Sequence, residues 1–243
     1  MKILLTLLWK AWFTILTITT LIILIPFAYL SLKINKQEWF YQVERLWAKL
    51  VFYGSGLYLQ KDLIPNSINP NQPYIVISNH TSALDILIML ILFPNNELVF
   101  VGKSEVASYP IIGYCFKKGH ILVDRKNRES RAKVYQYAQE KLQQGKSICF
   151  FPEGGVPEPE VILDNFKDGA FSIAITNQVP IVVFVIADIK ERFPFDWLKG
   201  SPGKVRVKQL PTIETKDLTK TDVNRLKNEC FAIILQQIDS FSK

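Results

Sequence analysis

The longest apolar run is the strongest constraint on how this chain can fold. Between Lys10 and Lys33 the sequence AWFTILTITTLIILIPFAYLSL carries no charge, and a helix of that length covers the roughly 30 Å hydrocarbon core of a bilayer. We therefore expect residues 1–63 to form a membrane-embedded segment, either one tilted helix or a helix pair completed by residues 38–59. A cleaved signal peptide is the competing interpretation, but this run exceeds its usual apolar core of about 7 to 15 residues and no small-residue cleavage site follows.

The remainder of the chain has the pattern of an α/β domain. A turn-rich connector, IPNSINPNQP at residues 64–73, precedes a globular domain that we place at residues 74–243. In that domain short β-type runs alternate with stretches of helical period, which predicts an α/β sandwich. The expected strands are YIVIS, ELVFVG, HILVD, SICFF, PIVVFVI and KVRVKQL. One expected helix begins with Ser130 as N-cap and stops at Gly145, and another opens with a capping box of Thr219 and Asp222.

Charge and cysteine content narrow the classes of partner without selecting one. Lysine and arginine total 29 against 22 acidic residues, and the net charge of +7 favours anionic partners such as nucleic acid, phospholipid headgroups or phosphorylated substrates. The three cysteines are far apart and lie in apolar surroundings, so we expect neither a disulfide framework nor a zinc site.

The stretch SNHTSALD, residues 78–85, contains one of only two histidines in the chain. Ser82 and Asp85 have the spacing of a capping box ahead of an apolar helix, which would leave His80 an ordinary turn residue. Alternatively, Asp85 accepts a hydrogen bond from one imidazole nitrogen of His80, fixes the tautomer and leaves the other nitrogen free as a general base. This stretch alone leaves both interpretations open.

Two further stretches end strands in polar residues. GHILVDR, residues 119–125, ends in Asp124 and Arg125, and FFPEGG, residues 150–155, ends in a glycine-containing turn with Glu153 expected to be exposed at its tip. Strand ends are where α/β sheets place their sites. Arginine is the residue expected where a phosphate is held by two parallel hydrogen bonds.

In their order and spacing these motifs resemble the glycerolipid acyltransferases typified by lysophosphatidic acid acyltransferase. NHTSALD is similar to the His-x4-Asp motif of that family, GHILVDR to its second motif, FFPEGG to its third and VPIVVF to its fourth, over residues 74–188. The resemblance implies a mixed-sheet α/β sandwich of that type behind the N-terminal membrane helix or helix pair. It also implies a role for each matching residue: His80 as general base, Asp85 as its partner, Arg125 in the acceptor-phosphate site, Glu153 and Gly154 in substrate binding, Lys103 as a further binding residue, and Pro180 in acyl-chain or structural contact.

The third motif departs from the family pattern. Many members continue it as Gly-Thr-Arg-Ser, whereas this chain reads EGGVPEPE. Lys103, Arg125 and Lys167 remain as candidates to hold a phosphate.

The resemblance implies transfer of a fatty acyl group from an acyl thioester to 1-acyl-sn-glycerol-3-phosphate, which gives phosphatidic acid. Another lysolipid acceptor is the alternative. The resemblance implies a thioester of acyl carrier protein or coenzyme A as co-substrate, and no metal or other cofactor. It places the enzyme at the inner (cytoplasmic) membrane, with its site on the cytoplasmic side and with membrane lipids as partners. A serine hydrolase would need a nucleophile such as the G-x-S-x-G elbow, which is absent. A membrane-anchored nucleic-acid binder would need a basic stripe, whereas the lysines are dispersed.

Overall fold

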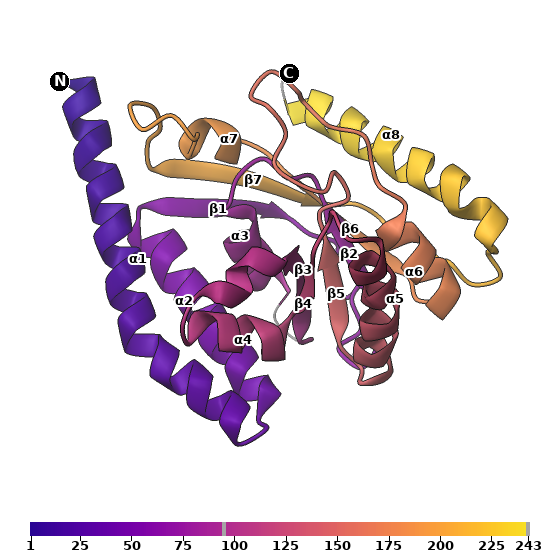
Figure 1. The fold of residues 1–243 in the computed structure, drawn as a ribbon. Helices are drawn as coiled ribbons and strands as arrows, with labels where there is room; N and C mark the ends of the chain where they lie inside the picture. Colours follow the sequence, from indigo (N-terminus) through magenta and orange to yellow (C-terminus); the bar gives the residue numbers. More distant parts are fainter. Residues whose placement is uncertain (94–95, 242–243) are drawn as a thin grey trace.

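A seven-stranded mixed sheet forms the centre of the protein (Figure 1). The computed structural model describes residues 1–93 and 96–241. Its strands run in the order β1-β7-β6-β2-β5-β3-β4, and every neighbouring pair is parallel except β6 with β7. The mixed α/β sandwich is thereby confirmed. The strands are β1 (Leu57–Asp62), β2 (Ile75–Ser78), β3 (Leu98–Lys103), β4 (Ile121–Val123), β5 (Ser147–Phe150), β6 (Ile181–Ile186) and β7 (Gly203–Gln209).

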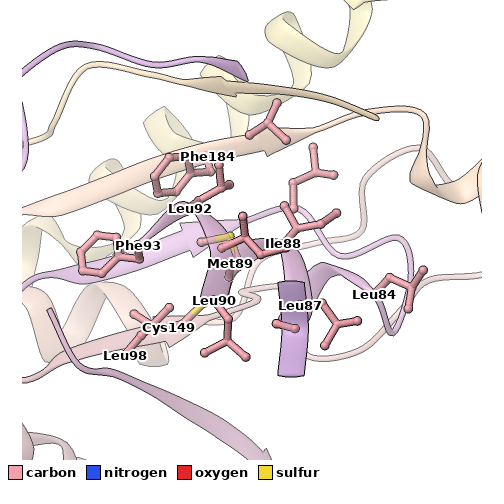
Figure 2. Packing of buried hydrophobic residues seen from close by; sticks show 14 of the residues in the cluster. Leu84, Leu87, Ile88, Met89, Leu90, Leu92, Phe93, Leu98, Cys149 and Phe184 are labelled. Atoms are coloured by element: carbon pink, nitrogen blue, oxygen red, sulfur yellow. The ribbon is translucent and has the colours of Figure 1, made fainter. Parts of the chain in front are cut away.

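Helices cover both faces of the sheet. They are α1 (Lys2–Lys33), α2 (Gln37–Gly54), α3 (Asp85–Leu92), α4 (Ile112–Gly119), α5 (Arg128–Gln143), α6 (Gly169–Asn177), α7 (Ile189–Arg192) and α8 (Val223–Phe241), with short 3-10 turns at Ser104–Ser108 and Lys220–Asp222. On one face α2 and α3 pack on Val76 and Phe184, and on the other α5, α6 and α8 pack on Ile75 and Val183. Figure 2 shows the first of these cores, in which Met89 and Leu92 of α3 lie with Phe184. All six residues of β6 are buried because helices cover both of its sides.

The first strand lies outside the region where the sequence places the globular domain. β1 pairs in parallel with β7, from Leu57 opposite Gly203 to Asp62 opposite Lys208. The sheet therefore takes an edge strand from residues 1–63, and the connector at residues 64–73 does not separate the sheet from the N-terminal segment. Only Leu57 of this strand is buried, and its sequence, LYLQKD, lacks the continuous apolar run of β2, β3 or β6.

The helix boundaries correct one expected cap and confirm two other features. Helix α5 begins at Arg128, where Asn127 and not Ser130 is the N-cap: the Asn127 side chain accepts the Glu129 and Ser130 N–H groups. Gly145 has the left-handed φ of +78° expected after this helix. Near the C-terminus, the capping box of Thr219 and Asp222 is present as predicted.

Helices α1 and α2 form an antiparallel pair along one side of the domain (Figure 1). Among the described residues α1 is the one helix whose length and composition suffice to cross a membrane, and only 22% of its most apolar window is buried in the protein. The indole N–H groups of Trp9 and Trp12 donate to the carbonyls of Ser55 and Gly54, at 2.7 and 2.9 Å. Most of the apolar surface of α1 is thus left without a protein partner.

Candidate active site

Asp85 binds both the imidazole of His80 and the backbone of the turn that precedes α3. Its Oδ2 atom lies 2.9 Å from Nδ1 of His80 and also accepts the backbone N–H groups of Thr81 and Ser82, at 2.6 and 2.8 Å. Asp85 is fully buried, and the His80 side chain is 14% exposed. One carboxylate oxygen therefore both organises the turn and orients the histidine, and the hydrogen bond expected under the second interpretation is present. Ser82 itself is not the N-cap, because α3 begins at Asp85 with Leu84 as the flanking residue.

The imidazole of His80 is also fixed through its ring face and its neighbours. Phe151 stacks on it with 4.1 Å between ring centroids and 16° between ring planes. Asn79 is buried and ties the end of β2 to the end of β6: its Nδ2 donates to the carbonyl of Ile186 and its Oδ1 accepts the Ile186 N–H, both at 2.9 Å. Because Nδ1 is engaged with Asp85, the other ring nitrogen is left to face the cavity that His80 lines.

Glu153 does not lie exposed at the tip of its turn, and that prediction is wrong. The side chain is buried, its Oε1 accepts the backbone N–H of His80 at 2.6 Å and its Oε2 accepts that of Asp164 at 2.9 Å. Burial raises the pKa of Glu153 to about 7, although both backbone hydrogen bonds act in the opposite direction. This carboxyl group holds the main chain of His80 in place and has no free face to offer a substrate.

The predicted polar residues converge because their strands are neighbours. His80 follows β2, Glu153 follows β5, Lys103 ends β3 and Arg125 follows β4, and these four strands are adjacent and parallel. All four residues therefore lie at the carboxyl edge of the sheet, where open α/β sheets bind ligands. Pro180 precedes β6 at the opposite edge, where its carbonyl accepts the N–H of Ile75 at 3.1 Å. Pro180 is thus a structural residue of the sheet and not a lining residue of the site.

A cavity of about 1190 Å³ opens from His80 into the interior between the helices. Its inner walls are apolar and come partly from α1 and α2, with Leu21, Leu24, Ile25 and Trp47 among the lining residues. This volume exceeds the roughly 300 to 1,000 Å³ of most small-molecule sites. The volume and the apolar lining suit a long hydrocarbon chain.

Cationic side chains also line this cavity, namely Lys103, Arg125, Arg128, Arg131 and Lys167. Arg125 donates from its guanidinium to the carbonyl of Gly154, which has a left-handed φ of +83°. Arg131 in turn donates to the carbonyl of Arg125 at 3.1 Å. Within residues 1–93 and 96–241 none of the five forms an ion pair. Five cations without an ion-pair partner among the described residues, beside apolar walls, suit an anionic amphiphile.

Sequence reasoning missed four residues of this site: Asn79, Phe151, Arg128 and Arg131. The two arginines are three residues apart on α5, and such spacing places side chains on one helix face. This spacing is the sequence signal that could have identified the two arginines. The local sequence around Asn79 and Phe151 gives no such signal, because their partners lie far away in the chain. The described residues contain no group of three histidine, cysteine or acidic side chains that could hold a metal ion.

Comparison with known proteins gives consistent results. A family model described as acyltransferase matches residues 60–187. The chain is 34% identical over 166 residues to 1-acyl-sn-glycerol-3-phosphate acyltransferase alpha of Mus musculus, a match that covers 65% of this chain and 55% of the mouse protein. It is 35% identical over 167 residues to the putative 1-acyl-sn-glycerol-3-phosphate acyltransferase acl-2 of Caenorhabditis elegans, with coverages of 67% and 58%. The chain thus spans about half the length of these curated relatives.

A solved structure is similar over the whole chain. The crystal structure of the 1-acyl-sn-glycerophosphate (LPA) acyltransferase PlsC from Thermotoga maritima superposes with a TM-score of 0.77, covering 100% of this chain and 98% of that one. The sequence identity is 21%, so this likeness concerns the fold.

Proposed function

This chain belongs to the acyltransferase family, and from that premise we propose that it transfers a fatty acyl group from an acyl thioester to 1-acyl-sn-glycerol-3-phosphate, forming phosphatidic acid. The observation that carries the proposal is the position of His80. Its Nδ1 is held by Asp85, and it lies in a cavity that joins an apolar interior to five cationic side chains. An acyl chain and a phosphate monoester need these two environments on either side of the reacting hydroxyl.

The reaction follows from the free nitrogen of His80. That nitrogen takes the proton of the acceptor hydroxyl as its oxygen attacks the thioester carbonyl. The buried carboxylate of Asp85, 2.9 Å from Nδ1, stabilises the imidazolium that forms. When the carbon–sulfur bond breaks, the imidazolium returns the proton to the departing sulfur. The products are an ester and a free thiol, and the histidine regains its starting state.

The cationic side chains account for a phosphorylated acceptor in spite of the altered third motif. Arg128 and Arg131 of α5 line the cavity and supply positive charge that the sequence EGGVPEPE lacks. A guanidinium holds a phosphate through two parallel hydrogen bonds, which a neutral monoacylglycerol cannot accept from it. The acyl donor in this proposal is a thioester of acyl carrier protein or of coenzyme A.

We also infer association with a membrane through the exposed apolar face of α1 and α2. Helix α1 contacts the globular part near both of its ends, at Trp9 with Phe193 and at Tyr29 with Tyr114. These two contacts are 20 residues apart, roughly 30 Å along a helix. A helix that crossed the bilayer could not keep one domain beside both ends, so these contacts favour a helix pair lying along the lipid surface. We place the site on the cytoplasmic side, where acyl thioesters are made.

The test is acyl transfer by detergent-purified protein with three acceptors: 1-acylglycerol-3-phosphate, unphosphorylated monoacylglycerol and lysophosphatidylcholine. We expect the phosphate monoester to have the highest kcat/KM. His80→Ala should lower kcat by about 10² to 10⁴-fold, the usual contribution of a general base. Wild-type activity in a folded His80→Ala protein would contradict the mechanism, and preference for another acceptor would contradict the substrate.

A further inference from the structure

The loop between α7 and β7, residues 193–202, carries large apolar side chains into solvent. Phe195 is 72% exposed, Trp197 64% and Leu198 55%. Figure 1 shows this loop beside the N-terminal half of α1. Three large, exposed apolar side chains within four residues indicate an interaction surface.

A buried lysine fixes this loop to α1. Lys10 is only 3% exposed, and its ammonium group donates to the carbonyls of Pro194 and Asp196 in the loop. The same ammonium lies 5.4 Å from the ring centroids of both Phe193 and Trp197, a distance at which a cation is attracted to an aromatic face. The charge of Lys10 is therefore used inside the protein to hold the loop.

Further hydrogen bonds hold the C-terminal part of the loop, where the chain continues into β7. Thr6 of α1 donates its hydroxyl to the carbonyl of Gly200 at 3.2 Å. Arg192 donates to the hydroxyl of Ser201 at 3.0 Å and to the carbonyl of Lys204 at 3.2 Å. Gly200 has a φ of +114°, and a Cβ there would lie 2.6 Å from the carbonyl oxygen of Arg192. Both ends of the loop are thus held, so its apolar tip keeps one orientation relative to α1.

The same loop reaches the catalytic cavity. Phe195 is one of its lining residues, whereas Trp197 and Leu198 lie outside it. Beyond the tip, Lys199 is an exposed cation in a 3.4 Å ion pair with Asp196. A cation next to tryptophan and leucine matches the composition of protein surfaces at the lipid headgroup level.

We propose that residues 193–202 form a bilayer-docking loop, in which Trp197 and Leu198 enter the lipid interface beside α1 and bring the cavity entrance at Phe195 to the membrane surface. The proposal rests on the membrane association inferred above and extends it to a second element far away in the sequence. A lipid bilayer is the occupant because the loop is fixed to the N-terminal half of α1, which itself exposes large apolar side chains: Leu5, Leu8 and Trp12 are each at least half exposed. A lysolipid acceptor could then pass from the bilayer along Phe195 toward His80.

The direct test is a fluorescent reporter on the loop. Leu198→Cys is labelled with an environment-sensitive fluorophore, and the three native cysteines are buried and leave the new thiol as the accessible one. With vesicles of phosphatidylcholine and phosphatidylglycerol we expect a blue shift and quenching by lipids brominated in their chains. The matched control is Tyr137→Cys on α5, an exposed aromatic position at 44%, which should show neither.

No spectral change at position 198 with vesicles would overturn the proposal. So would a shift without vesicles that grows with protein concentration, because it would assign the loop to a second copy of the chain. This readout needs no acyl transfer, so its failure is distinct from failure of the proposed reaction.

A kinetic arm tests the consequence for function. Replacing Leu198 by Ser should raise severalfold the lipid concentration that half-saturates turnover of an acceptor presented in vesicles, because a large apolar side chain no longer enters the bilayer. Turnover of a short-chain, water-soluble acceptor should stay unchanged. An equal loss with both acceptors would show a purely structural loop and contradict the proposal.

Discussion

Replacing Asp85 by asparagine separates the two tasks that one oxygen atom performs. In the wild type Oδ2 accepts from the His80 imidazole and from the backbone N–H groups of Thr81 and Ser82. The amide oxygen of the Asp85→Asn side chain could accept the same two N–H groups, and its NH2 would take the place of Oδ1, which has no partner among the described residues. The turn should therefore survive while the negative charge beside the histidine is lost.

The size of both effects follows from the geometry. Two unit charges about 4 Å apart at an effective dielectric constant of about 20 attract by about 4 kcal/mol, and losing most of that from the imidazolium lowers kcat by about 10² to 10³-fold. Asp85→Ala would instead leave two buried N–H groups without an acceptor, at about 1 to 3 kcal/mol each. For a domain of this size that lowers Tm by about 5 to 15 °C, whereas Asp85→Asn, which leaves only its own NH2 group without a partner, should lower Tm by about half as much.

The assay pairs thermal unfolding of both purified variants with steady-state acyl transfer. A kcat of Asp85→Asn within threefold of wild type would refute the role of the charge. Equal loss of Tm in the Asn and Ala variants would refute the claim that acceptance of the two N–H groups, and not the charge, stabilises the turn.

Three further predictions concern other parts of the site. The folded-state pKa of Glu153 is raised from its ordinary 4.5 to about 7, so its contribution to stability is complete below pH 4.5 and is lost as the pH rises to 7. The free energy of unfolding, measured by urea titration, should therefore fall by about 3 kcal/mol across that window. Glu153→Gln should show no such fall. Replacing Arg128 and Arg131 by Ala should raise KM for the phosphorylated acceptor about tenfold while Lys133→Ala, exposed on the same helix, leaves it unchanged; equal KM values would remove the arginines from the site. Asn79→Ala leaves both backbone groups of Ile186 unpaired and should lower Tm by about 5 to 15 °C in calorimetry, a result that an unchanged Tm would contradict.

The sequence identified the local parts of this protein. The six expected strands correspond to β2 through β7, because apolar β-type runs bounded by turn residues are a local pattern. His80 and Asp85 are five residues apart, so the turn between them alone brings their side chains together. Lys103 and Arg125 come to the same edge because both lie at the ends of parallel strands, a rule that needs the fold class but no coordinates.

The tertiary structure decided everything that depends on partners distant in the chain. Glu153 reads as a turn residue, yet its carboxyl group is buried against the main chain of His80, 73 residues away. β1 could not be found from its own pattern because its strand identity comes from pairing with β7. Lys10 borders the apolar run as an ordinary flanking charge, and only packing of the loop at residues 193–202 buries its ammonium group. Side chains whose environment is supplied by another segment carry no trace of it in their local sequence, so strand order and helix packing determine what they do.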